Sequence, residues 1–222
     1  MIKAVFFDLD ETLVDATGVH EVATRQAFKH FGFDYDEIKK MSPHHVSRGK
    51  KVVENIKVRV TAAQISERDL PFDKLIAYRE SVFINLISKH ATLLPGAKEA
   101  LMYCKEHKAI VAIVSSGSSL YINTVITKYD LSNLIDYTVS GDDVTKGKPD
   151  PESYEKAFSQ LYDKTIVKDE CLIVEDSEAG ILAGQGAHIP TLLVNKKAPT
   201  MKNIQSNHAI LSLQDFKVII HL

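Results

Sequence analysis

The chain has 222 residues, of which 45% are hydrophobic and 25% are charged, and its formal net charge at pH 7 is −2. These values are typical of a globular protein with a full hydrophobic core, and they exclude a largely disordered chain, a collagen-like chain and a small disulfide scaffold. The nearly balanced charge gives no general attraction to nucleic acid or to an anionic membrane, so neither is expected as a partner.

The N-terminal half of the chain is predicted to be one strand followed by helices. Residues 2–7 are apolar and rich in β-forming residues, which indicates a short buried strand. Apolar residues then recur with helical spacing over residues 19–31 and again over residues 72–87. The intervening residues 38–59 are basic and weakly helical. We therefore expect residues 15–90 to be entirely helical.

After residue 91 the predicted strands and helices alternate. Strands are expected at residues 109–114, 136–140, 171–174, 191–195 and, weakly, 209–211, and helices at residues 97–106, 121–129, 151–161 and 179–186. This alternation predicts an α/β fold with a doubly wound parallel sheet, that is, a Rossmann-like core. The helical block is too long for one crossover, so we interpret it as an inserted, all-helical cap domain. The predicted domains are an α/β core of residues 1–14 and 91–222 and a cap of residues 15–90.

Polar residues follow each of the first four predicted strands of this sheet. They are Asp8 and Asp10 after the first strand, Ser115 and Ser116 after the second, Lys148 in the loop after the third, and Glu175 and Asp176 after the fourth. Open parallel sheets bind ligands outside the carboxyl ends of their strands. Any one of these residues could be turn chemistry, but the full set at one rim predicts a functional site.

Four acids are expected to meet at this rim, namely Asp8, Asp10, Glu175 and Asp176. Carboxylates that lie close together repel one another, and a hard divalent cation removes that repulsion. Mg²⁺ is favoured because it prefers oxygen ligands, and the absence of histidine or cysteine from the set argues against zinc or copper. The alternative interpretation is that Asp10 and Asp176 are helix N-caps, as acids at strand-to-helix turns often are.

The rim residues together fit phosphoryl transfer. A carboxylate is ionised at neutral pH and needs no general base to act as a nucleophile. Lys148 is suited to neutralising phosphate, although a single lysine is more often a solvated surface residue. Ser115 and Ser116, followed by Gly117, would offer hydroxyl and backbone amide donors at a strand-to-helix turn. Positioning and charge neutralisation by such groups do most of the work in phosphoryl transfer.

Four segments of the chain resemble the four motifs of the haloacid dehalogenase superfamily, in the same order. They are residues 7–12 (FDLDET), 115–116 (SS), 146–152 (KGKPDPE) and 174–180 (VEDSEAG). The resemblance covers nearly the whole chain, and it implies that the helical insert is the small cap domain of that family. Its beta-phosphoglucomutase-like branch, which contains phosphatases and mutases of sugar phosphates, is the most similar.

The resemblance implies a role for each acid. Asp8 would be the nucleophile that forms an aspartyl-phosphate, and Asp10 would protonate the leaving group and then activate water. Mg²⁺ would be held by the carboxylates of Asp8 and Asp176 and by the backbone carbonyl of Asp10, with Glu175 as a further metal ligand or a supporting acid. An acid at position 10 also implies phosphate monoesters as substrates, because dehalogenases and phosphonate-cleaving members lack one.

The remaining roles implied by the resemblance concern phosphate binding and substrate choice. Ser115, Ser116 and Lys148 would bind the transferring phosphoryl group. Substrate choice would depend on the cap, where His20, Arg48 and Lys50 are polar candidates; the alternative for His20 is a surface histidine on a helix. Glu11 stands where the motif more commonly has glycine.

Three functions remain open from the sequence. The leading hypothesis is a Mg²⁺-dependent phosphatase that hydrolyses a small phosphorylated metabolite, in particular a sugar phosphate. The second is a phosphosugar mutase of the beta-phosphoglucomutase type, in which the cap excludes water and the phosphoryl group returns to the intermediate. The third is a phospho-accepting signalling module, which is disfavoured by the chain length and by the helical insert.

The sequence also favours a cytoplasmic protein that is a monomer or a weak dimer. No apolar segment reaches the roughly 18 residues that a membrane span requires. The apolar N-terminal run is broken by Asp8 and Asp10, unlike that of a secretory signal. Cys104 and Cys171 lie in apolar segments without the spacing of metal or redox motifs, which is typical of reduced, buried side chains.

Overall fold

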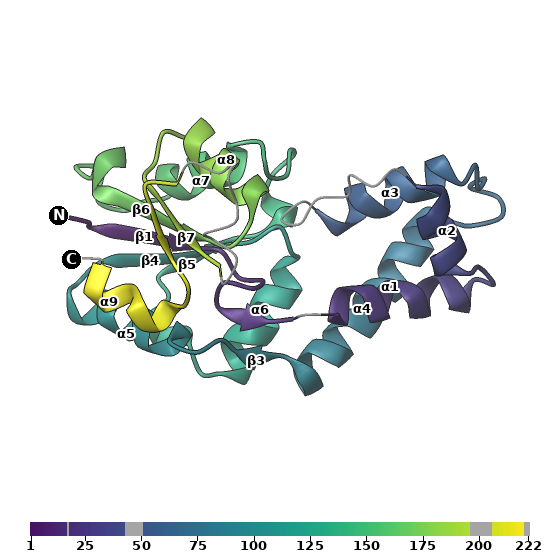
Figure 1. Cartoon of the computed structure of the whole chain (residues 1–222), viewed down its shortest axis with the longest axis horizontal. Coiled ribbons are helices and arrows are strands. Elements are labelled where there is room, and N and C mark those ends of the chain that lie inside the picture. Colours follow the sequence, from purple (N-terminus) through teal and green to yellow (C-terminus); the bar gives the residue numbers. More distant parts are fainter. Residues whose placement is uncertain (17, 43–50, 196–205, 220–222) are drawn as a thin grey trace.

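The computed structural model describes residues 1–16, 18–42, 51–195 and 206–219. Figure 1 shows an α/β core that carries both chain ends and a helical cap that extends from one side of it. This is the predicted architecture of a parallel sheet with an inserted helical domain.

The core is built on a six-stranded sheet with the strand order β5-β4-β1-β6-β7-β8. Every neighbouring pair in this sheet is parallel. The strands are β1 (Ala4–Phe7), β4 (Ile110–Val114), β5 (Tyr137–Val139), β6 (Cys171–Glu175), β7 (Thr191–Val194) and β8 (His208–Ile210). The sequence predicted all six, including the weak last strand.

The register of the sheet places the carboxyl ends of its three central strands level with one another. Phe7 of β1 lies opposite Ile113 of β4 and Val174 of β6. The backbone amide of the next residue, Asp8, donates to the carbonyl oxygen of Val174 at 2.9 Å. The residues that follow these strands therefore leave the sheet at the same edge.

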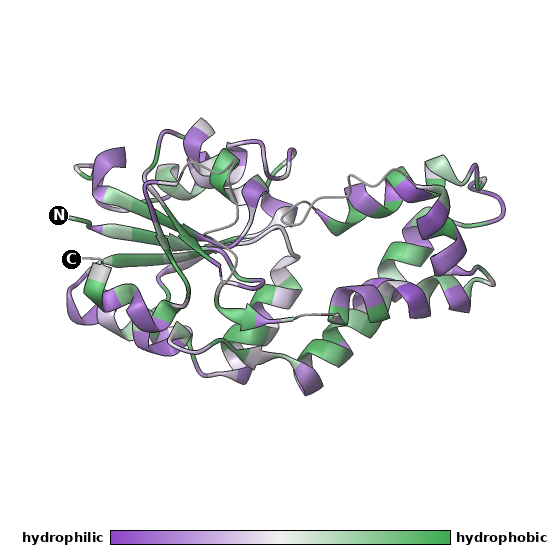
Figure 2. Ribbon diagram, viewed as in Figure 1, coloured by the Kyte–Doolittle hydropathy of each residue, from purple (hydrophilic) through white to green (hydrophobic). Residues whose placement is uncertain are grey.

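Helices cover both faces of the sheet (Figure 1). One layer contains α5 (Ala97–Glu106), α6 (Ser119–Lys128) and α9 (Phe216–Ile219), and the other contains α7 (Glu152–Ser159) and α8 (Glu178–Gly186). Alternate residues of β1 enter the two layers: Val5 and Phe7 pack with α5 and α6, and Ala4 and Phe6 pack with α7 and α8. Because both faces are buried, the central strands are continuously hydrophobic, as Figure 2 shows.

The cap consists of four helices with a hydrophobic cluster of their own. They are α1 (Val19–His30), α2 (Tyr35–Met41), α3 (Val52–Ala62) and α4 (Phe72–His90). Each helix contributes to the cluster, with Phe28, Tyr35, Ile56 and Leu75 among its members. The core-proximal ends of α1 and α4 join the main core instead, since Ala23, Phe83 and Ile87 pack there with residues of the sheet layer.

A two-stranded antiparallel ladder lies where the chain passes between core and cap. Strand β2 (Val14–Asp15) pairs with β3 (Thr92–Leu93), so that Val14 lies opposite Leu93 and Asp15 opposite Thr92. The sequence did not predict these strands, because two residues are too few to show an alternating pattern.

None of the helices in the described residues has both the length and the apolar composition needed to cross a membrane.

Candidate active site

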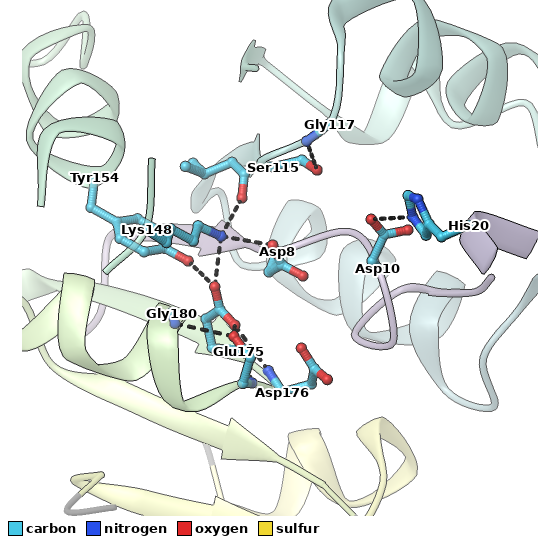
Figure 3. Close-up of polar contacts among 12 residues, drawn as sticks. Asp8, Asp10, His20, Ser115, Gly117, Lys148, Tyr154, Glu175, Asp176 and Gly180 are labelled. Atoms are coloured by element: carbon cyan, nitrogen blue, oxygen red, sulfur yellow. Dashed lines mark hydrogen bonds and ion pairs between the residues drawn. The ribbon is translucent and has the colours of Figure 1, made fainter. Parts of the chain in front are cut away.

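The predicted rim residues meet at the carboxyl edge of the sheet (Figure 3). Asp8 follows β1, Ser115 follows β4, and Glu175 and Asp176 end and follow β6. Lys148 reaches the same place from the loop between β5 and α7. All five side chains are buried. The structure thus brings together acids, a hydroxyl and a lysine that are far apart in the sequence.

Lys148 links the end of β1 to the end of β6. Its ammonium group donates to Asp8 Oδ1 at 2.7 Å, to Glu175 Oε1 at 2.6 Å and to the backbone carbonyl of Val114 at 3.0 Å. Only 1% of the residue is exposed. Burial by itself lowers the pKa of this amine, but the charges of Asp8 and Glu175 outweigh that effect and raise the pKa well above its usual value. Lys148 is therefore a buried permanent cation, and its interpretation as a solvated surface residue is wrong.

Glu175 holds Lys148 in place, because its own carboxylate is fixed by several further hydrogen bonds. Its Oε1 atom also accepts the Tyr154 hydroxyl at 2.8 Å. Its Oε2 atom accepts the Ser177 hydroxyl at 3.0 Å and the backbone amides of Asp176 at 3.2 Å and Ser177 at 3.3 Å. With both carboxylate oxygens already accepting two or more hydrogen bonds, Glu175 fits a supporting acid better than an open metal ligand.

Gly180 in α8 makes room for the Glu175 carboxylate. A Cβ atom at position 180 would lie 1.8 Å from the Glu175 carboxyl carbon. We therefore expect Gly180→Ala to force the carboxylate away, to release Lys148, and to lower the unfolding free energy by about 2–4 kcal/mol together with the activity. Chemical denaturation and a phosphatase assay measure both effects.

Gly186, near the end of the same helix, is the matched control. A Cβ atom there would lie 3.3 Å from the Pro151 ring. We expect Gly186→Ala to change stability by less than about 1 kcal/mol, since alanine favours the helix and the Pro151 ring needs to move by only a few tenths of an ångström. Equal stability of the two variants would contradict the anchoring role of Glu175.

The carboxylates of Asp8, Glu175 and Asp176 form a cluster that fits a metal ion, with one oxygen of each within 4.8 Å of the others. Burial and repulsion from Glu175 raise the pKa of Asp8 to about 8, although Lys148 acts against this. Burial and repulsion from Glu175 and Asp8 raise the pKa of Asp176 to about 9. A cation between these oxygens would offset the repulsion, and an all-oxygen donor set suits Mg²⁺.

The turn between β4 and α6 carries the predicted phosphate cradle. The buried Ser115 hydroxyl oxygen accepts the backbone amide of Gly117 at 3.0 Å, which folds the turn over the end of β4. Ser116 lies between them and is half-buried. Ser118 caps α6 by accepting the amide of Tyr121 at 3.2 Å. The turn therefore lies next to Lys148, whose ammonium group contacts the carbonyl of Val114.

Asp10 turns away from Asp8 and toward the cap, as Figure 3 shows. Its Oδ1 atom accepts the Tyr121 hydroxyl at 2.5 Å, and its Oδ2 atom lies 3.3 Å from Nε2 of His20 in α1. Burial raises the pKa of Asp10, but His20, Tyr121 and Arg79 outweigh it and the pKa is lowered. Asp10 is therefore held as a carboxylate at the boundary between core and cap.

Arg79 of α4 determines which nitrogen of His20 carries the proton. Its Nη2 atom lies 2.7 Å from Nδ1 of His20, and the guanidinium group lies over the Phe83 ring at 4.4 Å. A guanidinium can only donate, so Nδ1 accepts and Nε2 carries the hydrogen that faces Asp10. The structure places His20 at the site, and the interpretation of His20 as an ordinary surface histidine is wrong.

The interpretation of Asp10 and Asp176 as helix caps is also wrong. Helix α1 is preceded by Gly18, and α8 is capped by Ser177, whose hydroxyl oxygen accepts the amide of Gly180 at 3.1 Å. Because neither carboxylate caps a helix, both are available to the site.

Glu11 adopts the left-handed conformation, with φ of 58°, at the position where glycine is more common. Its Oε1 atom accepts the backbone amide of Ala16 at 3.2 Å. The side chain therefore reaches the segment that leads into the cap.

Other residues at the site were not predicted, and two predicted residues cannot be placed. Tyr121, Tyr154 and Arg79 all contact site residues, but each belongs to a helical stripe in which a single sequence does not distinguish it from a packing residue. Arg48 and Lys50, which were predicted to contribute to substrate choice, lie outside the described residues.

Residues 5–194 of the chain match the family model of the haloacid dehalogenase-like hydrolases. Among curated proteins, the chain is 28% identical to validoxylamine A 7′-phosphate phosphatase of Streptomyces hygroscopicus subsp. limoneus, over 85% of this chain and 84% of that protein. It is also 28% identical to a phosphorylated carbohydrates phosphatase of Thermotoga maritima, over 85% of this chain and 82% of that protein.

Solved structures share the fold. A crystal structure of beta-phosphoglucomutase from Clostridium difficile superposes with a TM-score of 0.78 at 22% sequence identity, covering 99% of this chain and 96% of that chain. At this identity the likeness supports the architecture of core and cap.

Proposed function

Because the chain belongs to the haloacid dehalogenase-like hydrolases, we propose that it is a Mg²⁺-dependent phosphatase acting on a small phosphorylated metabolite of the sugar-phosphate class. The observation that carries the proposal is the bridge from Lys148 to Asp8 at 2.7 Å and to Glu175 at 2.6 Å, beside the acidic cluster that includes Asp176. The names of the two relatives at 28% identity, both phosphatases, support the same class of reaction.

In the first half of the proposed reaction, Asp8 is the nucleophile. One of its carboxylate oxygens forms a bond to phosphorus while the bond from phosphorus to the ester oxygen breaks. Asp10, which is a carboxylate before substrate binds, first takes up a proton as the substrate enters and then gives that proton to the departing alkoxide. Lys148 holds Asp8 and neutralises charge on the phosphoryl oxygens, and the turn of Ser115 and Ser116 donates hydrogen bonds to them.

In the second half, Asp10 takes a proton from a water molecule, whose oxygen attacks phosphorus. The bond from phosphorus to Asp8 breaks, and inorganic phosphate leaves. Asp8, Asp176 and the backbone carbonyl of Asp10 would hold Mg²⁺, which when bound supplies positive charge that offsets the repulsion between these acids and an anionic substrate.

A panel of phosphorylated metabolites, assayed for released phosphate with Mg²⁺ and with a chelator, tests the proposal. We expect hydrolysis of one or more sugar phosphates in the presence of Mg²⁺ and none in the chelator. Absence of turnover across the panel, or turnover that survives the chelator, would contradict it.

Removing Asp176 is expected to abolish the response of the protein to Mg²⁺. In the wild type, saturating Mg²⁺ should raise the unfolding free energy by about 2–3 kcal/mol over the chelated protein, because the ion binds only the folded state. In Asp176→Asn this increase should disappear, since Asp176 is one of the three clustered carboxylates. Thermal denaturation with and without Mg²⁺ measures it.

Asp169 provides the control for this experiment. It is an exposed acid in the turn before β6, at the opposite end of the strand from Asp176. Asp169→Asn should keep the full Mg²⁺ response. A persistent response in Asp176→Asn would place the ion elsewhere.

A phosphosugar mutase is the second candidate, and the contact of His20 with Asp10 favours it, since a donor from the cap reaches the acid that would deprotonate the sugar hydroxyl to which the phosphoryl group returns. Incubation with a hexose 1-phosphate separates the two candidates: a mutase produces the 6-phosphate, and a phosphatase produces the free sugar and phosphate.

A further inference from the structure

Tyr121 of α6 contacts the loop after β1 through its hydroxyl group. The residue is fully buried in α6, and its ring packs edge-on against Phe83 at 4.9 Å and against His20 at 6.5 Å. Its hydroxyl donates to Asp10 Oδ1 at 2.5 Å. The aromatic contacts fix the ring, so the hydroxyl is directed at one oxygen of Asp10.

Asp10 is held from two sides, and the two donors are unequal. The bond from Tyr121 is short, whereas the hydrogen bond between His20 Nε2 and the other oxygen is long, at 3.3 Å. Tyr121 belongs to the core, as does Asp10, and His20 belongs to the cap. The bond to Tyr121 therefore joins two core residues, whereas the contact with His20 crosses from the cap to the core.

We infer that Tyr121 is a positioning residue for Asp10. Its hydroxyl fixes the plane of the carboxylate through Oδ1. The other oxygen, Oδ2, can then leave its contact with His20 and exchange a proton with the leaving group or with water. This inference rests on the proposed function, in which Asp10 transfers the proton. It adds a core tyrosine, absent from the four motifs, to the groups that control the proton transfer.

Tyr121→Phe tests the inference, because it removes the hydroxyl and keeps the ring. Two substrates are compared by kcat/KM, which reports the steps up to loss of the leaving group. One is the best alkyl phosphate of the panel, whose alkoxide must be protonated. The other is p-nitrophenyl phosphate, whose phenolate is a weak base and departs without help. We expect a loss of about tenfold or more for the alkyl ester and little loss for the aryl ester.

Tyr137→Phe is the matched control. Tyr137 lies in β5, and its hydroxyl donates to the backbone carbonyl of Ala157 at 2.6 Å. The Tyr137→Phe variant therefore also loses one hydrogen bond from a tyrosine hydroxyl, but this hydroxyl does not contact Asp10. We expect wild-type kcat/KM on both esters. Thermal denaturation of both variants shows whether either has lost its fold.

A selective loss on the alkyl ester supports the positioning role. An equal loss on both esters, which indicates a purely structural effect, or no loss on either, would overturn it. Crystal structures of the wild type and of Tyr121→Phe provide a second readout that does not require activity. The Asp10 carboxylate should rotate in the variant, and an unchanged carboxylate would overturn the inference even if the wild type hydrolysed neither ester and the proposed function failed.

Discussion

Asp8→Asn should lower the rate of phosphate ester hydrolysis by about 10⁴-fold or more while the protein remains folded. The amide nitrogen and oxygen of Asn are far poorer nucleophiles than a carboxylate, so the aspartyl-phosphate cannot form at a useful rate. Asn has the same shape as Asp, and its amide oxygen can still accept a hydrogen bond from the Lys148 ammonium group, which lies 2.7 Å from Asp8 Oδ1 in the wild type. Released phosphate, measured with the best substrate of the panel, gives the rate.

Three further measurements separate chemistry from folding in this variant. Circular dichroism and thermal denaturation should match the wild type, because Asn also relieves the repulsion that raises the pKa of Asp8. Labelling with a ³²P-phosphorylated substrate should mark the wild-type chain and leave Asp8→Asn unlabelled. Residual activity within about tenfold of wild type would assign the nucleophile to another residue.

The core of the fold could be predicted because most residues of its central strands are apolar. Segments such as 171–174 and 191–195 stand out between polar turns, and the structure has β6 and β7 there. The ladder of β2 and β3 was missed because it depends on two chain segments, near residues 14 and 92, that only the fold brings together.

The rim residues could be predicted to meet for the same topological reason. Parallel strands present their carboxyl ends to one edge of the sheet. The residues that directly follow β1, β4 and β6 are therefore neighbours for any conformation of the loops. Tyr121 could not be found in this way. It is 111 residues from Asp10, and its contact depends on how α6 packs against the loop after β1. The pairing of His20 with Asp10 depends in turn on where the cap lies, which no local pattern encodes.

Lys148→Met is expected to cost both activity and stability. Methionine fills a similar volume but removes the only cation that contacts Asp8 and Glu175 among the described residues. Breaking a buried ion pair on one side typically lowers the unfolding free energy by about 3–5 kcal/mol. Activity should fall by about 10³-fold or more, because the nucleophile and the phosphoryl group would then repel each other without compensation. Urea denaturation and released phosphate measure the two effects.

Lys146→Met is the matched control, two residues earlier in the same loop. Its side chain is 72% exposed and pairs only loosely with Asp150 at 3.7 Å, so stability should change by less than about 0.5 kcal/mol and activity should persist.

The loss of stability in Lys148→Met should also depend on pH. Burial and neighbouring acids raise the pKa of Asp8 to about 8 and that of Asp176 to about 9, above the values these acids have when unfolded. The folded state therefore binds more protons, and acidification favours it. Without Lys148 the pKa of Asp8 should rise further, so the difference from wild type should be smallest below about pH 7, where Asp8 holds its proton in both folded proteins, and should grow as the pH rises through 8 toward about 9.5. A difference that stayed constant over this range would mean that Lys148 supports the fold by packing and not by its charge.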